Sequence, residues 1–338
     1  METQKIKTAI VILTFNGIHW IKKFLPVLIE KSKDVNIYIA DNGSSDGTIE
    51  YVNNNYPNIA ILQNHNNEGY AKGYNDALKF LDEKYYVLIN SDIEVTDNWI
   101  NPIINLMEND LDIAACQPKI LDYNNKSNFE YAGASGGYID SLGYPYCRGR
   151  IFSTIEEDSG QYNDIKEVFW ASGACMFLRA EHFKSVDGFD NDFFAHQEEI
   201  DLCWRLKNKG YKIMVNPEST VYHVGGGTLD SSSPFKTYLN FRNNLFMLYK
   251  NLTVFKLLIT LFLRLPLDGI AAITFLKKEN GLGHLFSILR AHLLFYISLP
   301  LLTIKRSKIK QKNNLFGFSS FSILFKYHLL GQKKYSEL

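Results

Sequence analysis

The sequence predicts an α/β fold in which helices flank a mixed, mainly parallel sheet, followed by a helical, membrane-associating tail. Three observations predict it. Short runs of β-branched residues alternate with amphipathic stretches over the first half of the chain, which is the pattern of βαβ units. Polar clusters follow directly after these runs. Beyond residue 234 the chain becomes apolar and basic.

The chain has 338 residues, of which 46% are hydrophobic and 21% charged, and its net charge of zero conceals an asymmetry. Residues 235–338 contain sixteen Lys and Arg against three Asp and Glu, which leaves twenty against thirty-three in residues 1–234. We therefore predict one domain over residues 1–234 and a basic, apolar, helical region over residues 235–338. The acidic part suits a metal or a polar ligand, and the basic part suits an anionic membrane surface.

The spacing of the cysteines and the first apolar run indicate the cellular compartment of the protein. The four cysteines show no C-x-x-C spacing, which argues against a zinc site and against a secreted, disulfide-linked fold. Residues 9–15 form a short apolar run that ends at Asn16 and Gly17, which fits a buried strand and not a signal peptide. We expect a cytoplasmic protein.

The front half is expected to contain at least four strands with helices between them. The first part predicts strands at residues 7–13, 36–40, 59–63 and 85–90, and helices at residues 18–28 and 71–81. Residues 121–168, rich in Gly, Tyr and Asn, are expected to form loops and an irregular hairpin. The later part predicts a strand at residues 169–179, a helix at 198–209, and a strand pair at 212–216 and 220–224.

Polar clusters stand at the carboxyl ends of the four predicted strands, where open α/β sheets bind ligands. They cover residues 14–16, 41–48, 64–67 and 90–92. We therefore expect them to meet at one cleft.

The tail contains two apolar stretches, residues 252–276 and 285–304, that are long enough to span a membrane. Charges such as Arg264, Asp268 and Arg290 would each cost about 2.5 to 3.5 kcal/mol at the centre of a spanning helix. Helices that lie in the interface, with these charges reaching the headgroups, fit better.

A basic cluster follows the second stretch and would add about 1 kcal/mol per residue on an anionic leaflet. It consists of Lys305, Arg306, Lys308, Lys310 and Lys312. An ordinary helical subdomain with a basic face is the alternative. Nucleic-acid binding is not expected, because the basic residues lie among long apolar runs and not on a polar, aromatic face.

Asp41 ends the second predicted strand and begins a polar turn with two glycines. Such a turn is commonly only a turn. A carboxylate fixed there would also accept a hydrogen bond from the imide N–H of uracil or thymine. Thr14, Phe15 and Asn16 on the neighbouring strand would complete a base pocket.

Asp92 ends the fourth predicted strand, and Glu94 would point to the same side if the chain stays extended. Oxygen ligands of this kind suit Mg²⁺ or Mn²⁺, which commonly use one or two carboxylates and substrate phosphates. His223 ends the last predicted strand and would reach the same metal with a neutral imidazole.

The segment from Asn67 to Asn75 carries Gly69 and Gly73 at the start of a predicted helix. Its free N–H groups would bind phosphate, with Lys72 adding a positive charge. Close packing of the two glycines against the sheet explains the pattern equally well.

The predicted helix at residues 198–209 begins with an acidic cluster of Glu198, Glu199 and Asp201. Dipole and capping preferences explain this position without a function, and Asp201 has a partner in Arg205. Glu199 shares its face with apolar residues, which turns its carboxylate inward and would raise its pKa toward the range of a general base.

Taken in order, these motifs resemble the family 2 glycosyltransferases with the GT-A fold, particularly the bacterial rhamnosyltransferase-like branch of cell-surface polysaccharide assembly. The resemblance covers residues 6–249. It rests on V-I-L-T-F-N-G at 11–17, D-N-G-S-S-D-G-T at 41–48, N-E-G-Y-A-K-G-Y-N at 67–75, L-I-N-S-D at 88–92, S-G-A-C-M-F-L-R at 172–179, D-G-F-D-N-D-F-F at 187–194, E-E-I-D-L-C-W-R at 198–205 and H-V-G-G-G at 223–227.

The resemblance implies inverting transfer of a sugar from a nucleotide diphosphate by a GT-A domain over residues 1–234. Asp41 would bind the base, Asp92 the metal, and Glu199 would deprotonate the acceptor hydroxyl. The diphosphate would lie near Ser91 and the helix start at Asn67. The acceptor is expected at Trp170, Gly173, Asp201 and Arg205.

Two departures from the family pattern affect this assignment. The family usually has Asp where this chain has Glu199, and the longer side chain would shift the base or pass its role to Glu198. The metal motif is D-x-E and not D-x-D, so Glu94 stands where the family has a second aspartate. The sequence also lacks the Q-x-x-R-W motif of processive synthases, so the addition of a single sugar is expected.

The leading hypothesis is a glycosyltransferase that is peripheral on the inner face of the bacterial inner membrane. It would move one sugar from a dTDP- or UDP-sugar, dTDP-rhamnose among them, to a lipid-linked saccharide. A nucleotidyltransferase is a second hypothesis, although Asn16-Gly17-Ile18 stands where its Gly-rich basic loop would be. The third is a non-catalytic sugar-nucleotide-binding assembly protein, with Glu199 as an inert replacement of aspartate.

Overall fold

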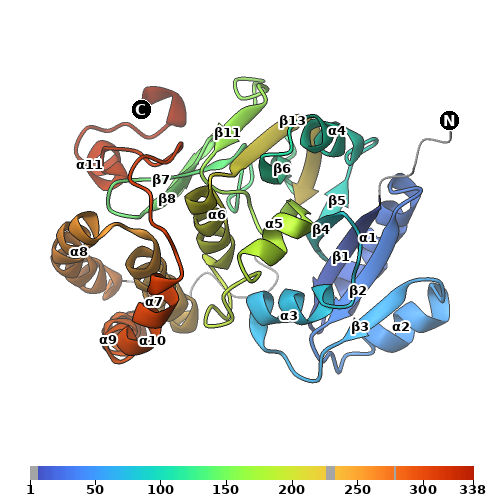
Figure 1. The fold of residues 1–338 in the computed structure, drawn as a ribbon, viewed down its shortest axis with the longest axis horizontal. Helices are drawn as coiled ribbons and strands as arrows, with labels where there is room; N and C mark the ends of the chain where they lie inside the picture. Colours follow the sequence, from blue (N-terminus) through green and yellow to red (C-terminus); the bar gives the residue numbers. More distant parts are fainter. Residues whose placement is uncertain (1–6, 226–232, 278) are drawn as a thin grey trace.

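The protein is described from a computed structural model that covers residues 7–225, 233–277 and 279–338. Its centre is a mixed sheet in the order β11-β13-β6-β12-β4-β1-β2-β3 (Figure 1). Two hydrophobic cores lie on opposite faces of this sheet, because neighbouring residues of a strand point to opposite sides. Ala9 and Val11 of β1 belong to one core, and Ile10 and Ile12 to the other.

The first half of the sheet is parallel, as the sequence predicts. Its strands are β1 (Thr8–Thr14), β2 (Asn36–Asp41), β3 (Ala60–Gln63) and β4 (Tyr85–Asn90). The helices between them are α1 (Ile18–Lys31), α2 (Thr48–Asn55) and α3 (Gly69–Leu78). In the register, Thr14 lies opposite Asp41 and Leu13 lies opposite Asn90. Polar residues that follow β1, β2 and β4 therefore meet at one edge.

The second half of the sheet is mixed and differs more from the prediction, because residues 93–95, 113–122 and 166–168 form strands that the sequence did not predict. Its strands are β5 (Ile93–Val95), β6 (Ile113–Asp122), β11 (Lys166–Val168), β12 (Cys175–Arg179) and β13 (Lys212–His223). The strand expected at residues 169–179 begins only at Cys175, antiparallel to β4 and β6. The pair expected at residues 212–224 is the single strand β13, with a register shift between Asn216 and Thr220.

Residues 121–168 are more regular than predicted. They contain a small antiparallel sheet in the order β10-β9-β8-β7. Its strands are β7 (Gly137–Ile139), β8 (Pro145–Cys147), β9 (Arg150–Ile151) and β10 (Thr154–Ile155). Each is two or three residues long, which is too short for a period-two pattern to stand out in the sequence.

Three more helices complete the domain. The structure contains α4 (Asn101–Asn109), α5 (Ala180–Ser185) and α6 (Glu198–Lys209), of which only α6 was predicted. α6 ends at Gly210 with φ of 105°, as the sequence indicates. Met107 of α4 packs in the same core as α1, and Leu202 of α6 in the same core as α3. Helices thus cover both faces of the sheet, and the α/β prediction is confirmed.

The tail is helical. Its helices are α7 (Pro234–Asn251), α8 (Val254–Phe275), α9 (Gly281–Ile297), α10 (Leu299–Ser307) and α11 (Ile323–His328), with a 3₁₀ turn at Tyr335–Glu337. The single stretch expected at residues 285–304 is broken into α9 and α10, which meet at 60°. Among the described residues, α8 has the length and composition to cross a membrane, and the bent pair α9–α10 would do so as one broken span. The division of the chain at residue 234 stays a prediction.

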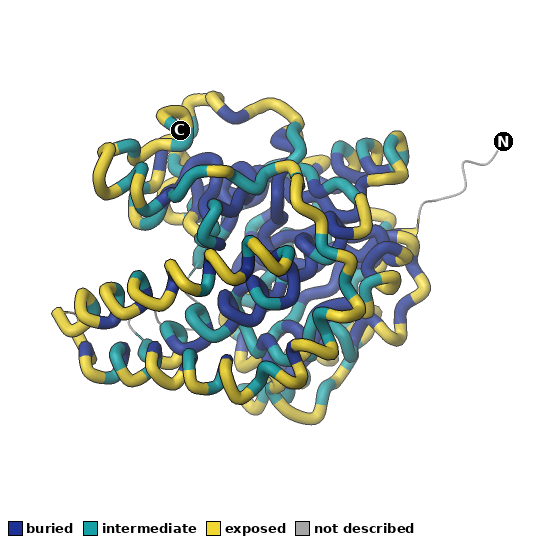
Figure 2. The backbone as a smooth tube through the Cα atoms, turned by 60° about the vertical axis from the view of Figure 1, so that its left-hand side comes forward, coloured by how far each residue is buried: buried dark blue, intermediate teal, exposed yellow. Residues whose placement is uncertain are grey.

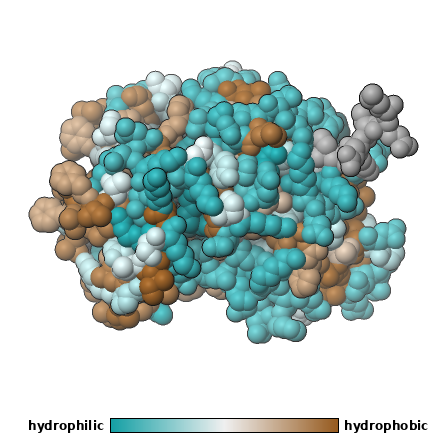
Figure 3. All heavy atoms as spheres, in the orientation of Figure 1, coloured by the Kyte–Doolittle hydropathy of each residue, from teal (hydrophilic) through white to brown (hydrophobic). Residues whose placement is uncertain are grey.

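The outer sides of α8, α9 and α10 are apolar. Figure 3 shows hydrophobic residues gathered over these helices, and Figure 2 shows exposed residues repeating along the tail helices. Phe255 and Phe262 of α8 are 75% and 79% exposed, and Phe286 of α9 is 64% exposed.

Arg264 and Asp268 of α8 face inward, which contradicts the prediction that these two charges reach lipid headgroups, whereas Arg290 of α9 is exposed. Arg264 and Asp268 are buried and lie 3.0 Å apart (Nε to Oδ1). The Arg290 guanidinium lies over the ring of Tyr238 on α7. His292 reaches Asp268 at 3.1 Å. Buried charges are tolerated because each has a polar or aromatic partner.

The basic cluster after α9 is only partly available to a membrane. Lys305 donates to Asp190 at 2.5 Å and to Asp192 at 2.6 Å, and Arg306 donates to the carbonyl oxygen of Tyr249. The outward charge that remains belongs to exposed side chains, namely Lys308, Lys310 and Lys312.

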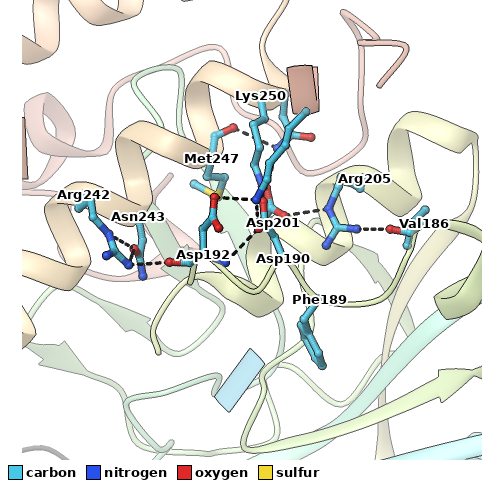
Figure 4. Close-up of polar contacts among 12 residues, drawn as sticks. Val186, Phe189, Asp190, Asp192, Asp201, Arg205, Arg242, Asn243, Met247 and Lys250 are labelled. Carbon is cyan, nitrogen blue, oxygen red and sulfur yellow. Dashed lines mark hydrogen bonds and ion pairs between the residues drawn. The ribbon is translucent and has the colours of Figure 1, made fainter. Parts of the chain in front are cut away.

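A buried ion-pair network joins the tail to the domain (Figure 4). Lys250 of α7 is 1% exposed, and its Nζ lies 2.5 Å from Asp190 and 2.9 Å from Asp201 of α6. Arg205 holds the other oxygen of Asp201 at 2.8 Å. The acidic domain and the basic tail therefore neutralise each other at this contact.

Removal of the buried lysine charge tests this contact. Lys250→Met removes the buried cation that Asp190 and Asp201 share, while Lys305 and Arg205 remain, so we expect a loss of up to about 3 kcal/mol in the free energy of unfolding. The exposed control Lys308→Met should change it by no more than about 0.5 kcal/mol. Urea unfolding measures both, and equal effects would contradict a structural role of the network.

Candidate active site

The ends of β1 and β4 approach each other closely at Gly17. A Cβ atom added to Gly17 would lie 2.3 Å from Thr14 Oγ1 and 3.6 Å from Ser91 Oγ. Glycine is needed there because no larger residue fits between the two strand ends. Thr14 and Ser91, predicted at different points of the chain, therefore border the same site.

Asp41 lies at the centre of this edge and is completely buried. Its Oδ2 accepts from the backbone N–H groups of Gly43 and Ser44, both at 3.0 Å. Its Oδ1 is buried and has no hydrogen-bond partner among the described residues, as is also true of Thr14 Oγ1. A buried oxygen without a partner costs about 1–3 kcal/mol, so both atoms are suited to a ligand that donates or accepts hydrogen bonds.

The turn after β1 forms one wall of this pocket. Asn16 has φ of 51°, and its side chain accepts from the Ser45 N–H at 2.8 Å. Its own N–H donates to Ser44 Oγ at 2.9 Å. The ring of Phe15 is 43% exposed beside this turn. The pocket thus combines an exposed aromatic ring with a fixed, unpartnered carboxylate oxygen.

Asp92 lies at the end of β4, where it is 7% exposed. Its Oδ1 lies 3.2 Å from His223 Nε2, and His223 Nδ1 lies 3.3 Å from Glu130 Oε1. Burial alone would lower the pKa of His223, but the two carboxylates raise it to about 10. Burial likewise favours the neutral form of Asp92, but the hydrogen bond and charge of His223 lower the pKa of Asp92 overall. The pair is therefore ionic at neutral pH.

The three predicted metal ligands, Asp92, Glu94 and His223, have different surroundings in the structure. His223 has a carboxylate at each nitrogen, and these carboxylates raise its pKa to about 10, which favours the charged imidazolium over the neutral imidazole that was expected. Glu94 lies on β5 and pairs with Lys126. Within the described ranges, no group of three His, Cys, Asp or Glu residues is placed to hold a metal. The Asp92 carboxylate would hold a Mg²⁺ or Mn²⁺ ion as a single protein ligand, because such ions commonly use one or two carboxylates together with substrate phosphates.

The start of α3 is packed and not open, so the phosphate-binding prediction for this segment is not supported. Gly69 N–H donates to Asn67 Oδ1 at 3.0 Å, and Tyr70 N–H donates to the Phe194 carbonyl oxygen at 2.7 Å. Lys72 is held by Glu68 and Asp76.

The two glycines of this segment allow close packing, because a side chain at either position would clash with neighbouring atoms. A Cβ atom at Gly73 would lie 2.9 Å from Leu13 Cδ1 of β1 and 2.8 Å from Asn42 Nδ2. A Cβ atom at Gly69 would lie 2.0 Å from the Phe194 oxygen. Close packing, the alternative named for this motif, explains both positions.

The start of α6 presents two carboxylates in a buried setting. Glu198 is 4% exposed and Glu199 is half-buried, and Oε2 of each has no partner in the part of the chain that the structure describes. Burial raises the pKa of Glu199 to about 7, which confirms the expected direction. Burial and the charge of Glu199 raise the pKa of Glu198 well above its usual range. Glu199 is therefore the more accessible and the more readily ionised of the two carboxyl groups.

Contacts through Gly173 bring α6 to the same sheet edge. The Tyr70 hydroxyl donates to the Gly173 carbonyl oxygen at 2.7 Å. A Cβ atom at Gly173 would lie 3.7 Å from Glu199 Cβ. The next carbonyl, of Ala174, accepts from the N–H of Asn90 at 2.9 Å. Asn90 is two residues before Asp92, so the structure brings residues 41, 92 and 199 to one edge.

Three residues predicted for the acceptor have structural partners instead. Trp170 is 2% exposed and its indole N–H donates to the Tyr138 carbonyl oxygen at 2.9 Å. Asp201 and Arg205 belong to the ion-pair network with Lys250 (Figure 4). A fully buried, paired Asp201 is not free to contact an acceptor, whereas Gly173 does border the site. Gly226 and Gly227, part of the H-V-G-G-G motif, lie outside the described residues.

Two residues at the site were missed by sequence reasoning. Tyr70 lies at the second position of α3, and Glu130 lies in a loop of residues 121–168. Only Tyr70 carried a signal, as the aromatic residue inside the glycine motif. Glu130 carried none, because its partner His223 is ninety-three positions away along the chain.

The comparison with protein families identifies the fold and class of this site. The model described as glycosyl transferase family 2 matches residues 9–186, which is more than half of the chain. The chain belongs to glycosyltransferase family 2. Its matched part holds β1 to β12 and therefore both Asp41 and Asp92.

This glycosyltransferase is similar to characterised bacterial relatives. It is 24% identical over 229 residues to the N-acetylglucosaminyl-diphospho-decaprenol L-rhamnosyltransferase of Mycobacterium tuberculosis, covering 63% of this chain and 75% of the relative. It is 24% identical over 220 residues to the rhamnosyltransferase WbbL of Escherichia coli K12, covering 63% and 82%. The resemblance to rhamnosyltransferases is thus confirmed.

Solved structures of low sequence identity share the GT-A fold. GalNAc-T7 with UDP, GalNAc and Mn²⁺ aligns with a TM-score of 0.58 at 14% identity, over 75% of this glycosyltransferase and half of that chain. S. aureus TarS aligns with a TM-score of 0.55 at 14% identity, over 89% of this chain and 53% of that one. These similarities establish the fold alone.

The raised pKa of Glu199 predicts a pH-dependent stability. Because its folded-state pKa of about 7 exceeds the ordinary 4.5, the carboxyl destabilises the fold as the pH rises between these values. Glu199→Gln should therefore raise the free energy of unfolding by about 1–3 kcal/mol at pH 8 and leave it unchanged at pH 4.5. Urea unfolding at both pH values measures this. The exposed control Glu50→Gln should show no such gain, and a gain equal to that of Glu199→Gln would contradict the assignment.

Proposed function

We propose that this glycosyltransferase moves one sugar, with inversion, from a dTDP- or UDP-sugar to a lipid-linked saccharide in cell-surface polysaccharide synthesis. The observation that carries the proposal is the meeting of Asp41, Asp92 and Glu199 at one sheet edge. The similarity to a relative named for a diphospho-decaprenol acceptor supports a lipid-linked acceptor. The two rhamnosyltransferase relatives favour dTDP-rhamnose as donor.

The base of the donor would bind at Asp41. Its unpartnered Oδ1 would accept the imide N–H that uracil and thymine share, which neither cytosine nor adenine offers. The exposed ring of Phe15 would stack on the base. Since both imide bases have the same donor, this contact selects the class of base and leaves the sugar to other contacts.

The diphosphate of the donor would lie at Asp92. When bound, a Mg²⁺ or Mn²⁺ ion would neutralise the charge that develops on the leaving phosphate. Asp92 would hold that ion, and the protonated His223 behind it keeps the carboxylate ionised and oriented. Ser91 would lie beside the diphosphate at the same strand end.

Glu199 would act as the general base. It would take the proton of the acceptor hydroxyl while that oxygen attacks the anomeric carbon, and the bond from this carbon to the phosphate oxygen breaks with its electron pair. Attack on the face opposite the leaving group inverts the anomeric carbon. Because burial raises the pKa of Glu199 to about 7, activity should increase as the pH rises through this value.

The tail would bind the inner face of the bacterial inner membrane as a peripheral anchor. Arg264, in the middle of α8, donates to the Leu142 carbonyl oxygen at 3.1 Å and to Asn244 of α7 at 2.5 Å. A helix that spans the bilayer would carry these polar groups of the domain into hydrocarbon, which is costly. The apolar outer sides of α8, α9 and α10 fit the acyl boundary, with Lys308 and Lys310 at the headgroups.

The reaction is tested with a panel of nucleotide sugars and a polyprenyl-diphosphate-linked acceptor. We expect release of dTDP or UDP and a product heavier by one sugar, measured by chromatography and mass spectrometry. Asp92→Asn should reduce nucleotide release by about 100-fold or more in the presence of Mg²⁺ or Mn²⁺. The exposed control Asp97→Asn should keep full activity. An Asp92→Asn variant with unchanged activity would refute the metal assignment.

Membrane binding is tested by flotation with vesicles of phosphatidylcholine and phosphatidylglycerol at low salt. We expect the protein to float, and replacement of Phe255, Phe262 and Phe286 by Ser to weaken binding by about 100-fold or more, because each ring leaves apolar contact. Phe80→Ser is the matched control, since Phe80 is 77% exposed on the catalytic domain. Wild-type protein that stays at the bottom, or equal effects of both changes, would contradict the anchor.

A further inference from the structure

The turn that precedes α6 has a strained backbone. His196 and Gln197 have φ values of 70° and 69°, a left-handed conformation that residues with a side chain rarely adopt. Two such residues in succession cost of order 1–3 kcal/mol each and persist only where the surroundings hold them. Glu198 and Glu199 follow directly, so the direction of both carboxylates depends on what holds this turn.

Asn243 of α7 holds the backbone of the turn. Its Nδ2 donates to the carbonyl oxygens of Ala195 at 2.9 Å and of His196 at 2.8 Å. Its Oδ1 accepts two hydrogen bonds from Arg242, at 2.9 Å and 2.7 Å. Asn243 is completely buried, so water cannot replace these contacts. The amide therefore fixes two consecutive peptide planes.

Asn244 holds the side chain of the turn. Its Nδ2 donates to Gln197 Oε1 at 2.9 Å and to the Gly143 carbonyl oxygen at 2.8 Å. Gln197 Nε2 in turn donates to the Asn240 carbonyl oxygen at 3.3 Å. Both ends of the Gln197 amide are thus bound to α7.

Arg264 of α8 completes the chain of contacts. It donates to Asn244 Oδ1 at 2.5 Å, which orients the Asn244 amide with its nitrogen toward Gln197. Asp268 holds Arg264 at 3.0 Å, and His292 of α9 holds Asp268 at 3.1 Å. A continuous set of buried polar contacts therefore runs from α8 and α9 to the residue before Glu198.

We propose that Asn243, Asn244 and Arg264 are positioning residues, which hold the turn at residues 195–197 so that the Glu199 carboxylate faces the sheet edge. The inference rests on the proposed role of Glu199 as the base. It assigns the polar residues inside the apolar tail a part in the reaction, through the turn and not through contact with substrate. Removing any of them frees the turn to relax and the carboxylate to move toward solvent.

The test compares Asn243→Leu, Asn244→Leu and Arg264→Met with Asn251→Leu. Asn251 is a matched control because it is a buried asparagine of the same helix that donates to Asp201 at 2.9 Å and to the Met247 carbonyl oxygen at 3.0 Å, and not to the turn. All four variants should lose thermal stability. Only the first three should lose kcat, by about tenfold or more, because small displacements of a reacting group are costly.

Three readouts separate positioning from a general loss of folding. Donor KM and the Kd of UDP and dTDP should stay within about twofold, since the base pocket is untouched. The pH at which kcat reaches half its plateau should decrease, because a more solvated Glu199 has a lower pKa. Arg264→Lys, which keeps the donor, should recover part of kcat. The titratable or charged groups near the turn are left in place, namely His196, Glu198, Tyr70, Cys147, Cys203 and Lys236.

Amide hydrogen exchange of residues 195–199 tests the proposal without activity. Exchange should become faster in the three positioning variants and stay unchanged in Asn251→Leu. Unchanged kcat and unchanged exchange in the three variants, or equal changes in the control, would overturn the proposal. If the wild-type protein releases no nucleotide from any donor, the proposed function fails, whereas the exchange experiment still decides whether these residues hold the turn.

Discussion

The buried contact of Lys250 with Asp190 and Asp201 is the interaction on which the second half of the site depends. Asp201 is completely buried on α6, and carboxylates in such surroundings require a cation at close range. One cation, Arg205, lies on α6 itself and the other, Lys250, comes from α7, so this contact ties α6 to the tail. The charge asymmetry of the chain is therefore partly an internal pairing, and Lys305 takes part in it together with Lys250.

The buried polar groups of the domain form two sets, those that have partners inside the protein and those that have none. Asp201, Arg205 and Asn251 are satisfied by one another, whereas Asp41 Oδ1 and one oxygen of Glu199 are buried without a partner in the described chain. Satisfied groups stabilise the fold, and unsatisfied ones cost stability until a ligand binds. The contrast lies within the first turn of α6: Glu199 borders the site, whereas Asp201 is bound to Arg205 and to Lys250 of α7.

The strands and helices that the sequence predicted well are those whose own residues show a regular apolar pattern. Strands β1 to β4 and helix α6 carry apolar periodicity and clear ends, so their bounds were predicted within two residues. β6 was missed because Gln117, Pro118 and Lys119 interrupt its apolar run, and pairing with β12 and β13 stabilises it instead. In the site, the strand-end rule predicted the meeting of Asp41 and Asp92. The roles expected of Lys72, Asp201 and His223 stay predictions. Asp201 and His223 pair with Lys250 and Glu130, which only folding brings near, whereas Lys72 pairs with its helix neighbours Glu68 and Asp76.

The sequence by itself determined the α/β class, the edge at which the polar residues meet and the family, because strand order, turn chemistry and motif spacing are local properties. Only the tertiary structure decided which charged residues are paired inside the protein and which are not. Arg264 and Asp268 illustrate this, since a charge in an apolar helix has the same sequence signature whether it faces lipid or a buried partner. Long-range contacts choose between these outcomes through the cost of leaving a buried charge unpaired.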